Sequence, residues 1–549
     1  MKINTLSILA YFSLFIFFTS CSKEFSDDLI KAQEEEVVVE EEEEEEEEPV
    51  FSDEKVIVSF TLPQAANTAL LSEDKQAIIN EDNTINFLLP HDSNVTAVVP
   101  EIIISEGATI SPASMEPQNF TIPVTYTVTA EDGTASTYTV SINLPGISER
   151  KALINMYYDT YINTTVDDDY SWDLDDPDMN NWYGVTAEDE KVIELNFDSD
   201  FKLNLTSDVT NLIHLKSLSM DDSNNTLIEE IGELTTLESI SCEYCGTGDS
   251  LEWLGNLVNL QRLNLFDTGL REIPESIGQL KSLTYLNLEL NPIGTLPESF
   301  GELTALETLN LYECDIESLP SSLEGLINLE TLNLSYNKLT DISAIKNLTN
   351  LKKLYISENQ LTTLHSNIST LTNLELLFAS DNSLNSIPLE IGNLTALTNL
   401  NLGRNNISSI PQEIGNLTNL TSLSLHTNDI ASIPASIGNL ANLETFLIYG
   451  NSISVVPNQI VNLANLIYLN LSTNNLDDIP ADIGNLSNLE RLYLQNNELT
   501  EIPVEFGRLV KLEQLYLTGN INLTSIPQSV CNLANTGTTI SVEDTVTCN

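Results

Sequence analysis

The chain has 549 residues, and 41% of them are hydrophobic, which is ample for a large buried core. It carries 82 acidic and 21 basic residues, so its formal net charge is −61. This balance argues against nucleic acid as a partner, because a phosphate backbone requires clustered lysine and arginine.

Residues 1–20 have the features of an export signal. Lys2 supplies a positive charge, residues 8–18 form an apolar run, and small residues precede Cys21. The run is too short for a membrane-spanning helix. The stretch resembles a bacterial lipoprotein signal, in which the cysteine is acylated and the chain is cleaved before it. This resemblance implies that Cys21 becomes a lipid-anchored N-terminus; cleavage at an ordinary signal site nearby is the alternative.

Residues 21–52 form an acidic segment that cannot bury a core. It contains an unbroken run of glutamates at residues 40–48, which repel one another and keep the chain extended. We interpret the segment as a disordered tether; calcium binding is the alternative, but nothing fixes these carboxylates in a coordination geometry. Residues 21–25, CSKEF, resemble the signals that direct Bacteroidetes lipoproteins to the cell surface. The implied location is the outer membrane or the cell surface.

Residues 53–145 show the period-two pattern of β-strands. Val56, Val58 and Phe60 alternate with other residues, which predicts that these three side chains share one face of a strand. Similar alternation later in the segment predicts an all-β sandwich. Residues 111–140 resemble the immunoglobulin-like modules near the N-termini of Bacteroidetes surface lipoproteins. That resemblance implies a spacer or a docking module without catalytic activity.

Residues 146–191 are predicted to cap the domain that follows. Ser148 precedes Leu153, Tyr157 and Tyr161, whose four-residue steps predict one short amphipathic helix behind a serine N-cap. An acid-rich loop comes next, and it lacks the glycine and the closing glutamate of an EF-hand loop. We interpret it as a solvated loop, with calcium binding as the alternative.

From residue 192 onward, one pattern, LxxLxLxxN, recurs at a nearly constant spacing. It begins fifteen times, at steps of 23 residues with two steps of 22. Such a period predicts a solenoid, because each unit can bury its apolar face only against its neighbours. The units begin at Val192, Leu215, Leu237, Leu260, Leu283, Leu306, Leu329, Leu351, Leu374, Leu397, Leu420, Leu443, Leu466, Leu489 and Leu512.

These units resemble the leucine-rich repeat, and the resemblance covers residues 192–530. It implies an α/β solenoid in which each unit contributes one short strand to a concave sheet. Residues 180–197 resemble the N-terminal cap of plant-type receptor repeats, although the paired cysteines of that cap are missing. The 22-residue unit that begins at Leu329 resembles the internalin type, which implies a locally tighter convex arc.

Cys242 and Cys245 have the spacing of redox dithiols and of half a zinc site. In the repeat register, Cys242 takes an inward leucine position, and Cys245 takes the asparagine slot that Cys314 fills in its own unit. The four histidines are dispersed along the chain. We therefore predict that the three cysteines are reduced packing residues and bind no metal; a redox or metal role for the pair is the alternative.

The C-terminal cap is predicted at residues 531–549. Cys531 and Cys548 lie beyond the last repeat, and in an exported protein we predict that they form a disulfide bond. Closing this loop would stabilise the last core layer by about 3 kcal/mol through loop entropy.

No motif in the sequence indicates an enzyme. A glycine-rich phosphate loop, a histidine cluster and a nucleophile in a strand-turn-helix setting are all missing. We therefore expect neither catalysis nor a cofactor. The resemblance to bacterial repeat adhesins and internalins implies that a membrane-anchored lipoprotein binds a protein partner on the concave face of its repeats.

Two other functions stay open. The first is glycan capture at the cell surface, but sugar sites favour exposed tryptophan platforms, and Trp172, Trp182 and Trp253 lie on no predicted concave strand. The second is a structural role in the envelope without a specific ligand.

The period-two pattern also predicts which residues form the concave surface. Residues two, four and six positions after each first leucine point outward, and most are small or polar. Two adjacent strands differ, with Lys353 and Tyr355 in one and Leu376 and Phe378 in the next. We predict that Tyr355 and Phe378 lie side by side and anchor the partner.

A weaker second cluster is predicted three strands further on, from His426, Leu447 and Tyr449. The alternative for all these aromatic residues is that they merely stack along the solenoid. Tyr493 and Tyr516 form a similar predicted ladder near the C-terminal end.

Overall fold

The structure is a computed structural model. The predicted export signal, most of the tether and Cys21 lie outside the residues that it describes. The described residues are 52–80, 82–89, 93–144, 147–161, 172–197, 203–221, 225–248 and 250–549.

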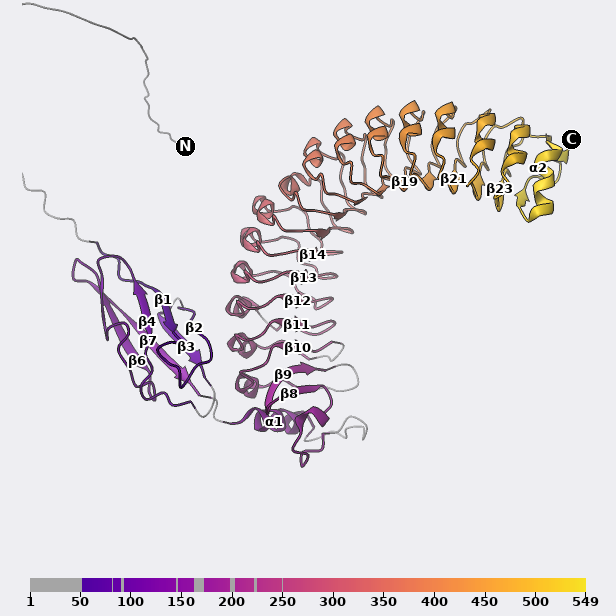
Figure 1. Cartoon of the computed structure of the whole chain (residues 1–549). Coiled ribbons are helices and arrows are strands. Elements are labelled where there is room, and N and C mark those ends of the chain that lie inside the picture. Colours follow the sequence, from indigo (N-terminus) through magenta and orange to yellow (C-terminus); the bar gives the residue numbers. More distant parts are fainter. Residues whose placement is uncertain are drawn as a thin grey trace, which may run out of the picture. The chain divides into compact units, whose positions relative to one another are not determined.

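The N-terminal part of the described chain is an all-β domain with two small sheets (Figure 1). One sheet has the antiparallel order β2-β1-β4, and the other has the order β3-β7-β6-β5, in which β3 runs parallel to β7. Phe60 and Tyr126 meet edge to face in its separate core, with ring centroids 5.3 Å apart. The strands are β1 (Ile57–Leu62), β2 (Lys75–Gln76), β3 (Thr84–Leu88), β4 (Glu101–Ile104), β5 (Thr109–Ser111), β6 (Val124–Thr129) and β7 (Ala135–Asn143).

The predicted face of the first strand is wrong. Phe60 is fully buried, but Val56 and Val58 are 50% and 62% exposed, and Ile57 takes the core position instead. The pairing of β1 with β4 shifts register between Ile57 and Ser59. A β-bulge of this kind inserts one residue and reverses the inward and outward positions on one side of it.

A helix and a short hairpin form the N-terminal cap of the repeats. The helix α1 (Glu149–Tyr161) begins after Ser148, whose Oγ accepts a hydrogen bond from the Lys151 amide at 3.2 Å. Glu149 ties this helix to the two ends of the first repeat, because its carboxylate accepts hydrogen bonds from the Val192 amide at 2.5 Å and the His214 ring at 2.7 Å. The remaining cap elements are the 3₁₀ turn η1 (Met179–Asn181) and the strand β8 (Val185–Glu188). β8 pairs antiparallel with β9 (Lys191–Asn196), the strand of the first repeat.

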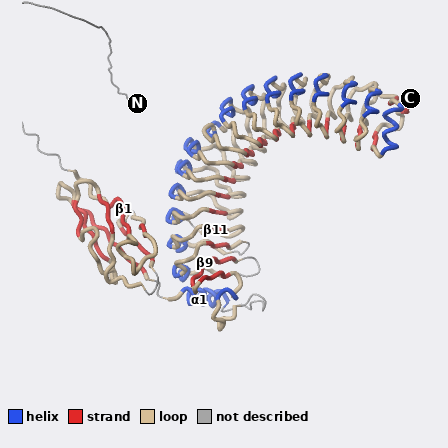
Figure 2. Tube along the Cα trace, viewed as in Figure 1, coloured by secondary structure: helices blue, strands red, loops and turns tan. Residues whose placement is uncertain are grey.

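The repeats form one curved ladder of parallel strands (Figures 1 and 2). It runs from β9 through β10 to β23 in strict chain order, so each of the fifteen predicted units supplies one strand, and the predicted solenoid is confirmed. Beyond β9 these strands are β10 (Ser217–Ser219), β11 (Ser239–Ser241), β12 (Arg262–Asn264), β13 (Tyr285–Asn287), β14 (Thr308–Asn310), β15 (Thr331–Asn333), β16 (Lys353–Tyr355), β17 (Leu376–Phe378), β18 (Asn399–Asn401), β19 (Ser422–Ser424), β20 (Thr445–Leu447), β21 (Tyr468–Asn470), β22 (Arg491–Tyr493) and β23 (Gln514–Tyr516).

Short 3₁₀ turns line the convex side of the arc, and the strands line its concave side (Figure 2). Most of these turns have five residues, but η8, in the 22-residue unit that begins at Leu329, has only three. The turns are η2 (Ser207–Asn211), η3 (Glu229–Glu233), η4 (Glu252–Asn256), η5 (Glu275–Gln279), η6 (Glu298–Glu302), η7 (Ser321–Gly325), η8 (Ser343–Ile345), η9 (Ser366–Thr370), η10 (Leu389–Asn393), η11 (Gln412–Asn416), η12 (Ala435–Asn439), η13 (Asn458–Asn462), η14 (Ala481–Asn485) and η15 (Val504–Arg508).

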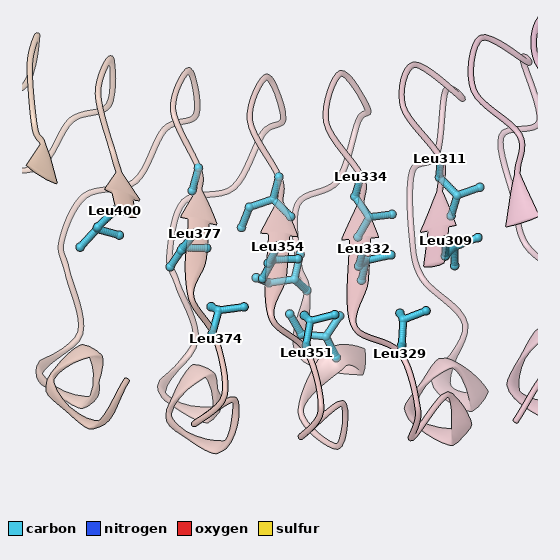
Figure 3. Close-up of a cluster of buried hydrophobic side chains, with 14 of the residues drawn as sticks. Leu309, Leu311, Leu329, Leu332, Leu334, Leu351, Leu354, Leu374, Leu377 and Leu400 are labelled. Carbon is cyan, nitrogen blue, oxygen red and sulfur yellow. The ribbon is translucent and has the colours of Figure 1, made fainter. Parts of the chain in front are cut away.

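The core lies between the sheet and the turns. Leucines from consecutive strands, such as Leu332, Leu354 and Leu377, follow one another in a row (Figure 3) and are fully buried. A buried asparagine closes most units. In one of them, Asn337 donates to the carbonyl oxygens of Leu311 and Leu334 and accepts from the Ile316 amide, so it satisfies backbone groups of two units.

A C-terminal cap covers the last unit. β25 pairs with β23 in parallel and so extends the concave sheet by one strand. Cys531 and Cys548 form a disulfide bond across this cap, with their Cα atoms 6.2 Å apart. The cap elements are β24 (Ser525–Ile526), α2 (Gln528–Cys531), η16 (Asn532–Thr536), β25 (Thr539–Ser541) and β26 (Thr547–Cys548).

Candidate functional site

The concave face is built by the alternation of side chains along each strand. In β16 and β17, Leu354 and Leu377 point inward and are fully buried, so the residues on either side of them point outward. The pairing of these strands sets Tyr355 opposite Phe378. Backbone register alone therefore brings the two aromatic residues together.

Tyr355 and Phe378 form a half-buried pair at the centre of the concave face. Their ring centroids are 5.4 Å apart and their planes cross at 73°, an edge-to-face contact. The same strand pairing places Lys353 opposite Leu376, which is also half-buried. The structure thus gathers these four sequence-predicted residues into one patch, which we call the central patch.

The second predicted cluster is a separate feature. The rings of His426 and Tyr449 stack almost parallel, with centroids 4.6 Å apart and an angle of 2°. Leu447 ends β20, two residues before Tyr449. His426 lies flat over Gly403, where a Cβ atom would come within 2.4 Å of its ring nitrogen. Burial, and then the charge of Arg404, lower the pKa of His426 below its ordinary value. His426 is therefore neutral at pH 7.

One strand separates the two clusters. β18 lies between β17 and β19 and presents Asn399 and Asn401 to the concave side, followed by Gly403. The predicted site residues therefore form two patches on one continuous face.

Sequence reasoning missed part of an aromatic group near the C-terminal end. Tyr468 meets Tyr493 edge to face at 5.1 Å, and Tyr493 stacks on Tyr516 at 4.6 Å. The guanidinium of Arg491 lies 5.9 Å from the ring of Tyr468. The missed residues are Tyr468 and Arg491. Both lie two residues after the first leucine of their unit, and this position in the repeat predicts that they point outward on the concave face.

Carboxylates are distributed unevenly over the concave positions. In the first five units these positions include Glu194, Asp221, Glu243 and Glu289. From the unit that begins at Leu306 to the last unit, all of which the structure describes, the same positions hold no aspartate or glutamate. The concave face thus changes from acidic to carboxylate-free along its length, in a chain of net charge −61.

The structure describes the acid-rich loop of the N-terminal cap only from residue 172 onward, and Asp167, Asp168 and Asp169 lie outside the described residues. Arg150 donates to the carbonyl oxygens of Leu174, Asp176 and Pro177, and Asp176 and Asp178 accept hydrogen bonds from nearby amides. These groups therefore already have partners. Within the described ranges, no group of three His, Cys, Asp or Glu side chains is placed to hold a metal ion.

The predicted reduced state of two cysteines is wrong. Cys242 and Cys245 are joined by a disulfide bond, because the turn between them brings their Cα atoms to 5.4 Å, within the range that a disulfide spans. Both lie in the buried core of the repeats. Cys314 is a free, buried thiol, and burial raises its pKa to about 12, so it stays protonated and unreactive at neutral pH.

None of the helices in the described ranges has the length and apolar character needed to cross a membrane.

Comparison with known families assigns the two parts of the chain separately. Residues 57–142 match the family described as "SGBP, N-terminal". The family "Leucine-rich repeat region" matches overlapping segments between residues 240 and 495, and "Leucine Rich repeats (2 copies)" matches residues 487–534. The corresponding search of curated proteins finds no match.

Several solved structures have a similar fold. The leucine-rich repeat protein LIC12759 of Leptospira interrogans is 33% identical, with a TM-score of 0.58, and the match covers 62% of this chain and 88% of that chain. The plant peptide hormone receptor RGFR1, solved in complex with RGF2, is 26% identical, with a TM-score of 0.55 and coverage of 67% and 72%. The Arabidopsis receptor kinase HAESA, solved with the peptide hormone IDA and the co-receptor SERK1, is 27% identical, with a TM-score of 0.55 and coverage of 68% and 66%. The repeat register, the family matches and the identity with the Leptospira protein together show that the chain belongs to the leucine-rich repeat family.

Proposed function

We propose that the protein binds a partner protein, or an exposed segment of one, on the concave face of its repeats, with Tyr355 and Phe378 as the anchor. The edge-to-face contact of these two rings on neighbouring strands carries the proposal. Aromatic residues held rigidly at the centre of a surface often dominate binding energy, because they bury a large area at a small cost in conformational entropy.

The surroundings of the pair favour binding over mere packing. The same strand position holds Asn333 in β15 and Asn401 in β18, so the fold itself does not require an aromatic side chain there. The buried leucines beneath both strands already close the core. A half-buried aromatic pair without a structural requirement is typical of an interaction site.

The related structures support the same kind of function. RGFR1 and HAESA were both solved with peptide hormones, and they share this fold at 26% and 27% identity. Glycan capture has less support from the tryptophans: Trp172 and Trp182 are buried in the N-terminal cap, and Trp253 packs partly buried on the convex side. None of the three offers a flat exposed platform on the concave face.

The proposal includes a location at the cell surface, with adhesion or partner recognition as the role. An acylated Cys21 and a solvated acidic tether together would hold the repeats away from an outer membrane. Replacing Cys21 with Ala should release the protein from the membrane fraction and abolish labelling by palmitate. A variant that stays in the membrane pellet, with no palmitate in the natural protein, would contradict the lipid anchor.

The binding site is tested by changing the anchor to the residue found on neighbouring strands. Tyr355→Asn with Phe378→Asn should weaken partner affinity by about 2 kcal/mol or more and leave the melting temperature nearly unchanged. The partner is first captured from surface proteins by the natural full chain, and its affinity is then measured by calorimetry.

The matched control makes the same change at Tyr493 and Tyr516, which stack on each other at the C-terminal end. This control should lose clearly less affinity than the central variant, because it leaves the anchor pair unchanged. Equal losses in both double variants, or unfolding of the central variant without a specific binding loss, would contradict a central anchor.

A further inference from the structure

The concave face of the last ten units differs in charge from the rest of the protein. These units, which begin at Leu306 and end with the one at Leu512, present aromatic, amide and hydroxyl side chains and no carboxylate at their outward strand positions. Two cations, Lys353 and Arg491, stand on this surface. We call it the neutral strip. Because the whole chain has a net charge of −61, the lack of carboxylates at these positions is a specific feature of this face.

The cations of the neutral strip lack the partners that flanking cations have. Lys352, the residue beside Lys353, forms an ion pair with Glu330 at 2.7 Å, and Lys338 pairs with Asp315 at the same distance. Further ion pairs elsewhere on the repeats are Lys216–Glu238, Lys281–Glu302, Lys346–Glu324 and Arg404–Asp381. Among the described residues, neither Lys353 nor Arg491 has a carboxylate within ion-pair distance.

We propose that the neutral strip selects a partner segment that carries carboxylate groups, and that Lys353 and Arg491 receive two of them. This inference rests on the proposed concave binding function and names the chemistry of the partner. It follows from two exposed cations without ion pairs on a surface from which carboxylates are absent.

Arg491 is well placed to bind a carboxylate. Its guanidinium lies 5.9 Å from the ring of Tyr468, and Tyr493 from the same strand contacts that ring. Planar aromatic neighbours orient a guanidinium and shield it from water, which strengthens its charge-assisted hydrogen bonds to an incoming carboxylate.

The spacing of the two cations sets the length of the segment. Lys353 lies on β16 and Arg491 on β22, six strands apart in the ladder. At about 4.8 Å per strand, the separation is about 29 Å, and an extended peptide spans that distance with about nine residues. The segment would cross the anchor pair at one end and the stacked tyrosines at the other.

Repulsion from the acidic remainder of the protein does not cancel this preference. Charges separated by more than a Debye length, about 8 Å at physiological ionic strength, are largely screened. Direct contact with Lys353 or Arg491 is only weakly screened, whereas the acidic residues of the repeats lie outside the outward strand positions of the neutral strip. The overall charge should therefore slow the approach of an acidic segment more than it weakens the final contact.

The test uses a display library of random twelve-residue linear peptides selected on the natural full chain. Selected peptides should be enriched in Asp and Glu together with apolar residues. One selected peptide and its version with Asn and Gln in place of Asp and Glu are then synthesised, and the acidic version should bind about ten-fold more tightly.

Two charge-matched variants locate the effect. Lys353→Gln with Arg491→Gln should remove the preference for the acidic peptide, and its binding should lose most of its dependence on salt concentration. The control variant, Lys352→Gln with Arg508→Gln, removes the same number of positive charges from outside the neutral strip. It should still bind the acidic peptide more tightly than the neutral one. Equal affinity of the two peptides for the natural chain, or an equal loss in both variants, would overturn the inference.

The selection also separates this inference from the proposed function. One outcome is that selected peptides require Tyr355 and Phe378 without being enriched in acidic residues. That result would support the concave binding site and refute only the preference for carboxylate groups. A library that yields no peptide dependent on these two residues would refute both.

Discussion

At the scale of single residues, the buried asparagine that closes most units is expected to contribute strongly to stability. Asn337 is buried and forms hydrogen bonds to the carbonyl oxygens of Leu311, Leu334 and Ser335, and its Oδ1 accepts from the amides of Cys314 and Ile316. Removing this side chain leaves several buried backbone groups without a hydrogen-bond partner, and each unpaired group costs about 1–3 kcal/mol.

Asn337→Ala should therefore lower the free energy of unfolding by several times the effect of a surface change. The matched control is Asn328→Ala, because Asn328 is exposed and donates a single hydrogen bond to the Thr304 carbonyl. Chemical denaturation of both variants measures the difference. Similar losses in the two variants would show that the ladder of asparagines contributes little beyond a surface contact.

His426 gives a pH-dependent prediction. Its pKa in the folded protein lies below the ordinary value of 6.5, first because of burial and then because of Arg404. Below pH 6.5 the unfolded chain binds a proton at this histidine before the folded chain does, so stability falls as the pH falls. His426→Ser, with the serine found at the equivalent position of other units, should lose less stability between pH 7.5 and pH 5.5 than the natural chain. Identical losses would contradict a lowered pKa.

Individual residues also show which side-chain positions could be predicted from the sequence and which could not. The outward positions of Tyr355 and Phe378 followed from the period of the repeat, because each buried leucine fixes its neighbours. Val56 and Val58 were assigned to the wrong face, since a bulge leaves no mark in the alternation itself. The bond between Cys242 and Cys245 depends on the local turn, and the repeat register does not reveal it.

At the scale of elements, close packing of the convex turns explains the glycine that recurs in them. At Gly415 in η11, an added Cβ atom would lie 2.5 Å from the carbonyl oxygen of Ser436 in the next turn. Backbone atoms cannot move aside without separating the two units, so only glycine fits. Gly415→Ala should lower the free energy of unfolding by about 1–3 kcal/mol.

The same position offers a natural control. η13 carries Val461 there instead of glycine, so the backbone around it already accepts a side chain. Val461→Ala should change the free energy of unfolding by much less than Gly415→Ala. Denaturant titrations compare the two, and equal effects would argue against steric contact between turns as the cause.

The C-terminal cap depends on its disulfide bond. Cys531 and Cys548 close a loop with a sequence separation of 17 residues, and loop entropy predicts a stabilisation of about 3 kcal/mol. Cys531→Ser with Cys548→Ser should lower stability by about this amount and speed hydrogen exchange in β25. Mass mapping of non-reduced peptides should show this bond and the one between Cys242 and Cys245. Free thiols at positions 531 and 548 would contradict the closed cap.

Elements were predictable to different degrees. The strands of the ladder followed directly from the repeated leucines, because only one register buries all of them. The pairing of β3 with β7 in parallel joins segments far apart in the chain, and the local pattern does not specify it. The three-residue turn η8 lies in a unit that is one residue shorter than most. The sequence therefore showed this change in unit length, but it did not show which strands pair in the N-terminal domain.

At the scale of the whole molecule, the repeats form a long concave surface whose chemistry changes along its length. The first five units offer carboxylates, and the later units offer aromatic rings, amides and two unpaired cations. The fold and the register were predictable from sequence because they repeat. The contacts between aromatic residues and the pairing of the flanking cations were not, because they depend on side-chain positions in neighbouring units.

Site-specific crosslinking of the full chain on intact cells tests concave binding most directly. A photoreactive phenylalanine is placed at Ser380, beside Phe378 on the concave face, and in a second variant at Val258, which is 43% exposed outside that face. We expect the partner to be crosslinked from position 380 and not from position 258. Crosslinking to the partner from position 258, with none from position 380, would show that the partner does not bind the concave face.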